Sequence, residues 1–129
     1  MKAIVCIDNH LGMMFHNRRQ SQDRKLREKI KELTSVLHMN AYSYALYQDV
    51  FKDAYVVEDF LDVDGYCLFE NVSMKQYEDI IEELYVFYWN RDYPADFYLD
   101  IDLDQYECFY EEEFVGTSHE KITLRKYRK

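Results

Sequence analysis

The sequence predicts an α/β fold with a single mixed, mostly parallel sheet, flanked by helices and finished by a C-terminal antiparallel hairpin. Two observations support this prediction. Strand-like and helix-like segments alternate along the first part of the chain, and strand-like segments alone follow. The first strand-like segment, residues 3–7, is apolar at every position, which is typical of a central strand covered on both faces.

Length and composition favour one domain over residues 1–129. A chain of 129 residues with 48% hydrophobic residues can bury one core, and three glycines with one proline leave little material for linkers. The opening apolar run is far shorter than the roughly 20 residues that cross a bilayer, so we expect a cytoplasmic protein with no membrane contact. Three cysteines lie in apolar runs and are expected to be reduced core residues, namely Cys6, Cys67 and Cys108.

The first predicted helix follows an irregular segment. Residues 8–20 have no clear period and contain Gly12, so we interpret them as a loop. Ser21 is then a candidate N-cap, with Asp23 in the first helical turn. Apolar residues recur at helical spacing among basic ones, at Leu26, Ile30 and Leu33. The pattern predicts an amphipathic helix with a basic outer face.

The middle of the chain holds short elements. Residues 36–39 form the next predicted strand, and Asn40 or Ser43 is placed to cap a second helix. Residues 55–57 and 66–69 are further strand-like runs on either side of an acidic segment.

The last part begins with the clearest helical pattern in the chain. Residues 73–76 fit a capping box, and apolar residues continue at helical spacing as far as Leu84. Residues 84–89, 106–114 and 121–127 then predict three strands, the last two of which form the closing hairpin.

Charge divides the chain into three parts. Residues 1–48 carry 8 basic and 4 acidic residues, residues 49–113 carry 3 and 20, and residues 114–129 carry 5 and 1, which gives the net charge of −9. General nucleic-acid binding is not expected, because phosphate contacts with basic residues supply most of its affinity. Two basic ends that meet in the fold would still form a local anion site. The acidic middle is otherwise interpreted as a solvated face.

The order of the elements, with particular residues, resembles dihydrofolate reductase over most of the chain. Residues 2–8 with Gly12 and Met13 are similar to that family's opening strand and the start of its mobile loop, and residues 37–40 to the end of its next strand. The family's last three strands are matched, in order, by residues 83–85, 95–97, 101–102, 118–119 and 127–129. The resemblance implies a reduced, dihydrofolate-reductase-like form of the predicted fold.

Departures from this family bear on function. The family holds its cofactor's phosphates against glycine-containing turns, since glycine permits a close approach of the backbone. The corresponding places here read Asn-Ala-Tyr-Ser at residues 40–43 and Glu70-Asn71, and a carboxylate at a phosphate site would repel the cofactor. The chain is also shorter, with material missing where adenine-binding elements would lie. We therefore expect no cofactor and no NADPH-dependent reductase activity.

More loosely, the chain resembles a group of short bacterial proteins that sometimes carry a ribonuclease Z label. Such a nuclease binds two metal ions through a His-x-His-x-Asp-His run. Histidines occur here only at positions 10, 16, 38 and 119, without such a run. We reject that mechanism and expect no metal.

The densest polar segment runs from His16 to Asp23 into a predicted helix start. Its other members are Asn17, Arg18, Arg19, Gln20, Ser21 and Gln22. Helix-start N–H groups and two arginines can hold a phosphate or a carboxylate. A surface loop followed by a capped helix is the plainer interpretation. The resemblance places Asp23 near the family's substrate-binding acid.

A second polar segment, residues 116–121, contains Ser118, His119 and Glu120. These contiguous residues cannot form a triad in a strand, because successive side chains face opposite ways. In the resembled fold this turn approaches the first mobile loop, so His119 would face Arg18, Arg19 and Asp23 across one cleft and act as acid or base. A strand-start histidine bonded to backbone is the alternative. Residues 89–94, with Trp89 and Arg91, would stack a flat ligand or simply pack in the core.

Two classes of function stay open, and the sequence identifies no enzyme activity. The first is a non-reductase protein that binds a small anionic or nucleotide-like ligand between residues 16–23 and 116–121, with Asp23 or His119 as candidates for proton transfer. The candidate ligand contacts are His16, Asn17, Arg18, Arg19, Gln20, Ser21, Ser118 and His119.

The second class is an acidic interaction or inhibitor module for a basic protein partner, comparable to phage-encoded nuclease inhibitors that mimic nucleic acid. One continuous patch would favour this class if it joined Glu58, Asp59, Asp62, Asp64, Asp100, Asp102 and Asp104.

Overall fold

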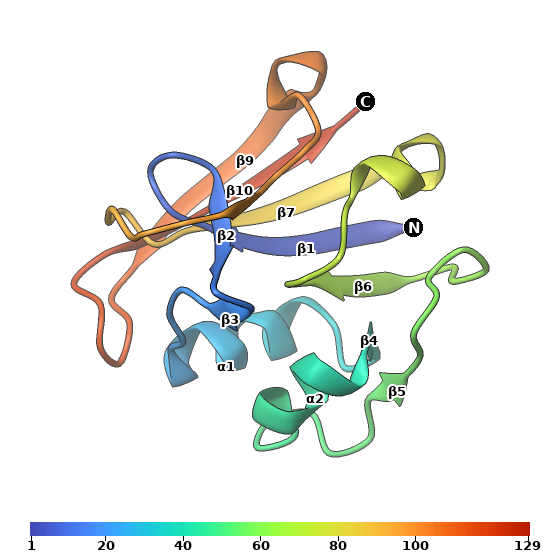
Figure 1. Ribbon diagram of the computed structural model, residues 1–129, viewed down its shortest axis with the longest axis horizontal. Helices are drawn as coiled ribbons and strands as arrows, with labels where there is room; N and C mark the ends of the chain where they lie inside the picture. The colour runs from blue at the N-terminus through green and yellow to red at the C-terminus, as the bar shows by residue number, and fades with distance from the viewer.

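A seven-stranded sheet forms the centre of the computed structural model, which describes residues 1–129 (Figure 1). Its strands are β1 (Lys2–Ile7), β4 (Leu37–Met39), β5 (Tyr55–Val56), β6 (Tyr66–Phe69), β7 (Glu83–Tyr88), β9 (Glu107–Phe114) and β10 (Ile122–Arg128), in the spatial order β5-β4-β6-β1-β7-β10-β9. The first five strands in this order pair in parallel, whereas β10 pairs antiparallel with both β7 and β9. The predicted mixed sheet with a C-terminal antiparallel hairpin is confirmed.

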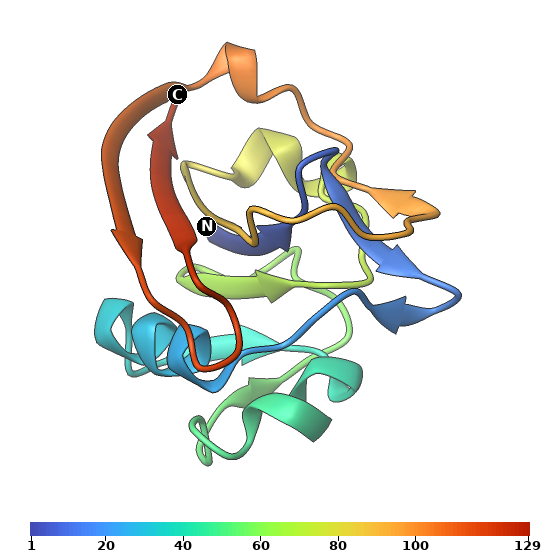
Figure 2. The ribbon, with the colours of Figure 1, turned by 90° about the vertical axis from the view of Figure 1, so that its left-hand side faces the viewer.

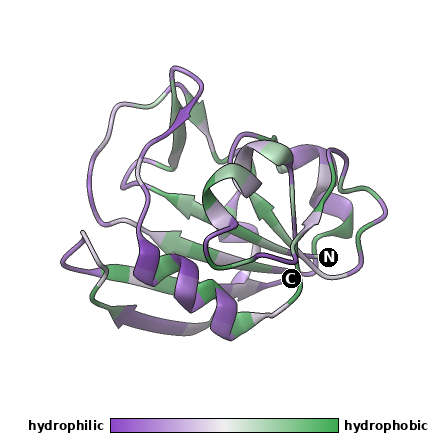
Figure 3. Ribbon diagram, turned by 90° about the horizontal axis from the view of Figure 1, so that it is seen from below, coloured by the Kyte–Doolittle hydropathy of each residue, from purple (hydrophilic) through white to green (hydrophobic).

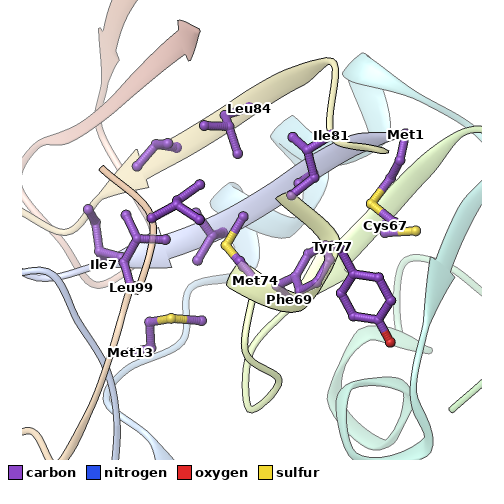
Figure 4. Packing of buried hydrophobic residues seen from close by; sticks show 14 of the residues in the cluster. Met1, Ile7, Met13, Cys67, Phe69, Met74, Tyr77, Ile81, Leu84 and Leu99 are labelled. Carbon is purple, nitrogen blue, oxygen red and sulfur yellow. The ribbon is translucent and has the colours of Figure 1, made fainter. Parts of the chain in front are cut away.

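Strand β1 lies at the centre because it is apolar on both faces. Ala3, Val5 and Ile7 join one buried cluster, and Ile4 between them joins the other, as the alternation of side chains in a strand requires. In Figure 4, Ile7, Met13, Met74 and Leu99 gather on the first of these faces. Figure 3 shows the same arrangement as hydrophobic central strands surrounded by hydrophilic loops.

Two helices cover the second face. Helix α1 (Arg24–Leu33) buries Leu26 and Ile30 against Ile4 and Phe87, and α2 (Ala41–Tyr47) adds Tyr47 to the same cluster (Figure 2). Asn40 caps α2 by accepting a hydrogen bond from the Ser43 N–H at 3.0 Å, as one of the two predicted caps. None of the helices combines the length and the apolar character that crossing a bilayer needs.

Residues 8–20 form a small sheet, so the prediction of a loop was wrong. Strands β2 (Gly12–Phe15), β3 (Arg18–Arg19) and β8 (Phe97–Tyr98) pair in the order β3-β2-β8. The turn between β2 and β3 consists of His16 and Asn17, which both have positive φ, 50° and 61°. Such two-residue hairpin turns need left-handed backbone at both positions, and Asn is one of the few residues that adopts it readily. Without a glycine, the turn gave little signal in the sequence.

Two predicted helix starts were also wrong. Asp23, and not Ser21, caps α1, because its carboxylate accepts the Leu26 N–H at 3.1 Å. The expected helix after residue 73 is a short 3₁₀ helix, η1 (Lys75–Ile80), and β7 already begins at Glu83. Ser73 donates its hydroxyl to Asp100 instead of capping this element, and Asp100 accepts the N–H groups at its start. A second 3₁₀ helix, η2 (Leu103–Gln105), precedes β9.

All three cysteines are free thiols, as predicted, but not all of them lie in the core. Cys67 is buried and Cys6 half-buried, and burial raises the pKa of the Cys67 thiol to about 12. Cys108 is exposed, because β9 forms an edge of the sheet whose outer positions face solvent.

The packing of β7 against the helices predicts that shortening one of its buried side chains will greatly lower the free energy of unfolding. Phe87 is 0% exposed and lies in the cluster under α1, so Phe87→Ala is expected to lower the free energy of unfolding by about 4 kcal/mol. Urea unfolding followed by circular dichroism measures this change. Phe109 on β9 is the matched control, because it is 37% exposed, and Phe109→Ala is expected to cost less than about 1 kcal/mol. Equal losses would contradict the assigned register of the sheet.

Candidate functional site

Residues 20–23 and the turn at residues 116–121 meet in space, and the turn lies beside α1 in Figure 2. The link is the Asp23 carboxylate, which accepts hydrogen bonds from the N–H groups of Thr117 at 3.0 Å and Ser118 at 2.9 Å. The Lys25 N–H donates to the Thr117 hydroxyl at 3.0 Å. The two segments that the sequence singled out are therefore joined by direct hydrogen bonds.

Asp23 stays ionised in this position. Burial alone would raise its pKa, but hydrogen bonds from the backbone of Ser118 and Thr117, from His119 and from the Leu26 N–H outweigh burial, and the pKa lies far below its usual value. The residue is 2% exposed. A charged carboxylate is stable here because both of its oxygens accept hydrogen bonds from backbone N–H groups and Oδ2 also binds His119.

His119 lies against this carboxylate and is itself 4% exposed. Its Nδ1 is 2.9 Å from Asp23 Oδ2, and a carboxylate only accepts, so Nδ1 carries a proton. Its Nε2 faces two hydroxyls, Ser21 Oγ at 2.9 Å and Tyr93 Oη at 3.2 Å. Trp89 stacks on the ring, with centroids 4.5 Å apart. These contacts fix both the position and the orientation of the imidazole.

Close backbone approach explains the glycine in the turn. A Cβ atom at Gly116 would lie 2.5 Å from Asp23 Oδ2 and 2.8 Å from Ile122 Cδ1, so a side chain at this position would displace the carboxylate. Ser118 contributes mainly its backbone N–H, since its hydroxyl is 3.4 Å from Asp23 Oδ2 and 3.3 Å from His119 Nδ1.

Ser21 faces a narrow crevice at the carboxyl ends of β1, β6 and β7, where open parallel sheets bind their ligands. The crevice is lined by Cys6, Met13, Arg19, Gln20, Ser21, Tyr47, Phe69, Glu70 and Trp89. Its free volume is about 10 Å³, which is room for a single water molecule. The β2–β3 hairpin and α2 thus pack closely over the sheet at this point.

The two predicted anion-binding arginines do not converge. Arg19 forms a bidentate ion pair with Glu70, at 2.9 and 3.0 Å, and its guanidinium lies over the Tyr42 ring at 4.6 Å. Arg18 is exposed and points to the opposite side of the strand, because neighbouring strand residues alternate. Glu70 therefore already supplies the anion that Arg19 binds.

The remaining predicted residues lie around the hairpin. His16 and Asn17 are exposed at its tip, and Asn17 lines an open hollow of about 410 Å³ with Met14, Asn71, Asp96 and Phe97. Gln20 donates through its amide to Asp8 Oδ2 at 3.1 Å and to the Pro94 carbonyl at 3.2 Å. Of the candidate residues, Ser21, Asp23, Ser118 and His119 form one cluster, and the hairpin residues lie outside it.

The sequence analysis did not identify a pair of cations that lies beside this cluster. Arg91 and Lys121 line an open hollow of about 300 Å³ together with Trp89, Asn90 and Glu120. Arg91 donates to the Ser118 carbonyl at 3.2 Å, which places it against the turn. Trp89-Asn90-Arg91 stood out in the sequence as an aromatic-arginine segment, but only the fold shows that Lys121 lies across from it. No group of three His, Cys, Asp or Glu side chains is arranged to hold a metal ion.

Comparison with solved structures places the fold. The chain is similar to a dihydrofolate reductase from Enterococcus faecalis, solved with NADP(H) and RAB-propyl, with a TM-score of 0.72 over 98% of this chain and 94% of that one. At 12% identity this likeness shows the fold alone, and the fold that the resemblance implied is confirmed. No protein-family model and no curated protein matches the sequence.

The hydrogen bonds to Asp23 predict a strong dependence of stability on this carboxylate. Asp23→Asn is expected to lower the free energy of unfolding by about 3 kcal/mol at pH 7, because it removes a buried charge that accepts several hydrogen bonds. Chemical denaturation of both proteins measures the loss, with Asp53→Asn at an exposed carboxylate as control.

The sign of the pH effect follows from the lowered pKa. The contribution of Asp23 is complete above its unfolded pKa of about 3.9 and is lost as the pH falls toward the lower folded value. The stability difference between the wild type and Asp23→Asn should therefore narrow as the pH falls below about 4. A difference that stays constant down to pH 2 would contradict the assigned charge state.

Proposed function

We propose that the protein binds a small anionic or nucleotide-like ligand at the turn of residues 116–121, beside Trp89, which is one side of the cleft predicted with residues 16–23, and that it does not act as a reductase. The observation that carries the proposal is the open hollow of about 300 Å³ in which Arg91 and Lys121 lie next to the buried Asp23–His119 pair. A hollow of this size suits a small ligand or the charged end of a larger one.

Charge favours this hollow over the other spaces near the loop. Arg91 forms no ion pair there, whereas Lys121 is paired with Glu113 at 3.5 Å, and Glu120 is the one carboxylate among the lining residues. In the crevice Arg19 is neutralised by Glu70, and the hollow at the hairpin contains Asp96 without a cation among its lining residues. Arginine binds phosphates and carboxylates through paired donors, and an indole ring next to it provides a flat apolar contact. Arg18 and Arg19 contribute to binding only if the hairpin shifts toward the ligand.

The proposal that the chain lacks reductase activity rests on what fills the two places where the resembled family binds phosphate. At the start of α2, the Ala41 N–H donates to the Glu58 carboxylate at 3.0 Å, and the Ser43 N–H to Asn40. At the second place Glu70 pairs with Arg19, and the Asn71 amide accepts from Asn40 at 2.8 Å. Side chains, two of them carboxylates, thus occupy the donors that a phosphate would need.

The alternative, an acidic module for a basic partner, has less support. Asp59 accepts a hydrogen bond from the Tyr77 hydroxyl of η1, and Asp100 accepts the N–H groups at the start of η1. Both carboxylates are thus already bound by groups of the chain itself. Several of these carboxylates also serve locally, as Asp102 does in capping η2.

Ligand binding is expected to raise the melting temperature by mass action. We expect a thermal-shift screen of nucleotides, folates, nicotinamide cofactors and short RNA and DNA to give an increase of several degrees with one anionic class. Arg91→Ala/Lys121→Ala should abolish that increase, because it removes both cations of the hollow.

A double variant of equal charge loss provides the control for this screen. Lys52→Ala/Lys75→Ala removes two exposed lysines that form no ion pair, and it should keep the full shift. The proposed site is wrong if Arg91→Ala/Lys121→Ala keeps the shift, and in particular if Arg18→Ala removes it instead. A screen without any shift would refute anionic-ligand binding as a whole.

The occupied phosphate positions predict no hydride transfer from NADPH. The purified protein should consume NADPH no faster with dihydrofolate than buffer does, as followed by NADPH absorbance. A dihydrofolate-dependent rate that survives further purification would overturn the non-reductase assignment.

A further inference from the structure

The contacts of His119 form a connected chain of three polar groups that the anion-binding proposal does not use. Asp23 Oδ2, the His119 ring and Ser21 Oγ are linked by two hydrogen bonds of 2.9 Å each, one at each ring nitrogen. The residues come from two segments: Ser21 and the α1 cap Asp23 lie between β3 and α1, and His119 precedes β10. This is the geometry in which a carboxylate orients an imidazole and the imidazole accepts the proton of a serine.

Each member is held in its working position. Asp23 is fixed by the N–H groups of Leu26, Thr117 and Ser118, so it can stabilise an imidazolium without itself taking the proton. Because Nδ1 donates to Asp23, Nε2 of the neutral ring is the free acceptor, and it faces Ser21. The Trp89 ring prevents the imidazole from turning away.

Access is possible only from the serine side. Asp23 and His119 are buried, whereas Ser21 is half-buried and lines the crevice. The crevice wall is largely apolar near Met13, Phe69 and Trp89, and its free volume is close to that of one water molecule. Met13 is a flexible side chain that can yield to a small group. A small acyl group, such as acetyl, can therefore enter only when the Met13 side chain moves aside, and bulkier acyl groups are excluded.

We propose that Ser21, His119 and Asp23 form a nucleophilic site that accepts a small acyl group from an activated ester. Ser21 Oγ bonds to the ester carbonyl carbon while its proton moves to His119 Nε2. The bond from that carbon to the leaving oxygen breaks, and the departing alcohol takes the proton from Nε2. A water molecule then gives a proton to Nε2 and its hydroxide to the acyl carbon, and Ser21 regains its proton as the acid leaves. No oxidant or metal is needed.

Tyr93 shares Nε2 with Ser21 and is the group most able to compete with it. Its hydroxyl is 3.2 Å from Nε2, farther than Ser21 Oγ, and its backbone N–H is tied to Asp8 Oδ2 at 3.2 Å. We assign it a positioning role, in which it holds the ring when Ser21 is acylated. The position of the label in the experiment below distinguishes the two hydroxyls.

The test is covalent labelling of the intact protein with a small alkyl fluorophosphonate, a probe that reacts with activated serines. Mass spectrometry is expected to find one phosphonyl group on Ser21. Ser21→Ala should abolish labelling, and His119→Gln and Asp23→Asn should slow it by roughly two orders of magnitude or more, since the first removes the base and the second removes the carboxylate that orients it. Release of p-nitrophenolate from p-nitrophenyl acetate should follow the same order.

Ser35→Ala is the matched control, because Ser35 is an exposed serine far along the chain from the cluster, and it should label at the wild-type rate. Ser21→Ala removes one hydroxyl and is not expected to unfold the protein, which a melting curve checks, so the proposal stays testable even if the His119 and Asp23 variants are unstable. Absence of label, label on Tyr93, or a rate independent of His119 would overturn it. Labelling requires no anionic ligand, so its outcome is separate from that of the ligand screen.

Discussion

The Asp23 carboxylate is the group on which the arrangement of the two ends of the chain depends. It caps α1 through Leu26 and binds the turn before β10 through two N–H groups and His119, which is 96 positions away in the sequence. Because the carboxylate is buried, it needs these hydrogen-bond donors. The donors from Thr117 and Ser118 are backbone N–H groups, so they reach the carboxylate only if the turn follows this path. Gly116 is part of the same constraint, since only a residue without Cβ lets the turn come this close.

Charge pairing explains why basic ends and an acidic middle coexist in one chain. The acidic strand β9 lies beside β10 and α1, and its carboxylates pair with basic residues from both ends of the sequence, as Glu112 does with Lys29 and Glu107 with Arg128. Arg27, one of the basic residues of the helix for which a basic outer face was predicted, is instead buried and pairs with Asp49. The ion pairs of β9 each add little stability, because solvent screens them. Their main effect is to offset the repulsion among the carboxylates of this edge strand.

The sequence was a good guide where one physical signal decided the structure. Continuous apolar character identified β1, and the order of strand-like and helix-like segments identified the fold. Both patterns arise because apolar side chains must be buried in the core. Local signals failed where a residue distant in the sequence supplies the hydrogen bond. Ser73 looks like a cap, but Asp100 satisfies the start of η1, and Ser21 looks like a cap, but its hydroxyl binds His119. Likewise, Arg19 was predicted to bind a ligand anion, whereas in the structure it pairs with Glu70, which is 51 positions away in the sequence.

The fold of this protein does not determine its chemistry. A TM-score of 0.72 at 12% identity means that the backbone path is kept while most side chains differ, and function depends on side chains. At the carboxyl edge of the sheet, the chain places a filled crevice, a carboxylate–imidazole–hydroxyl chain and two cations around Trp89. A buried charge and an oriented histidine cost stability unless they are fully hydrogen-bonded, and here they are. Trp89 packs against His119 and also borders the hollow that contains Arg91 and Lys121, so one buried residue connects the two features.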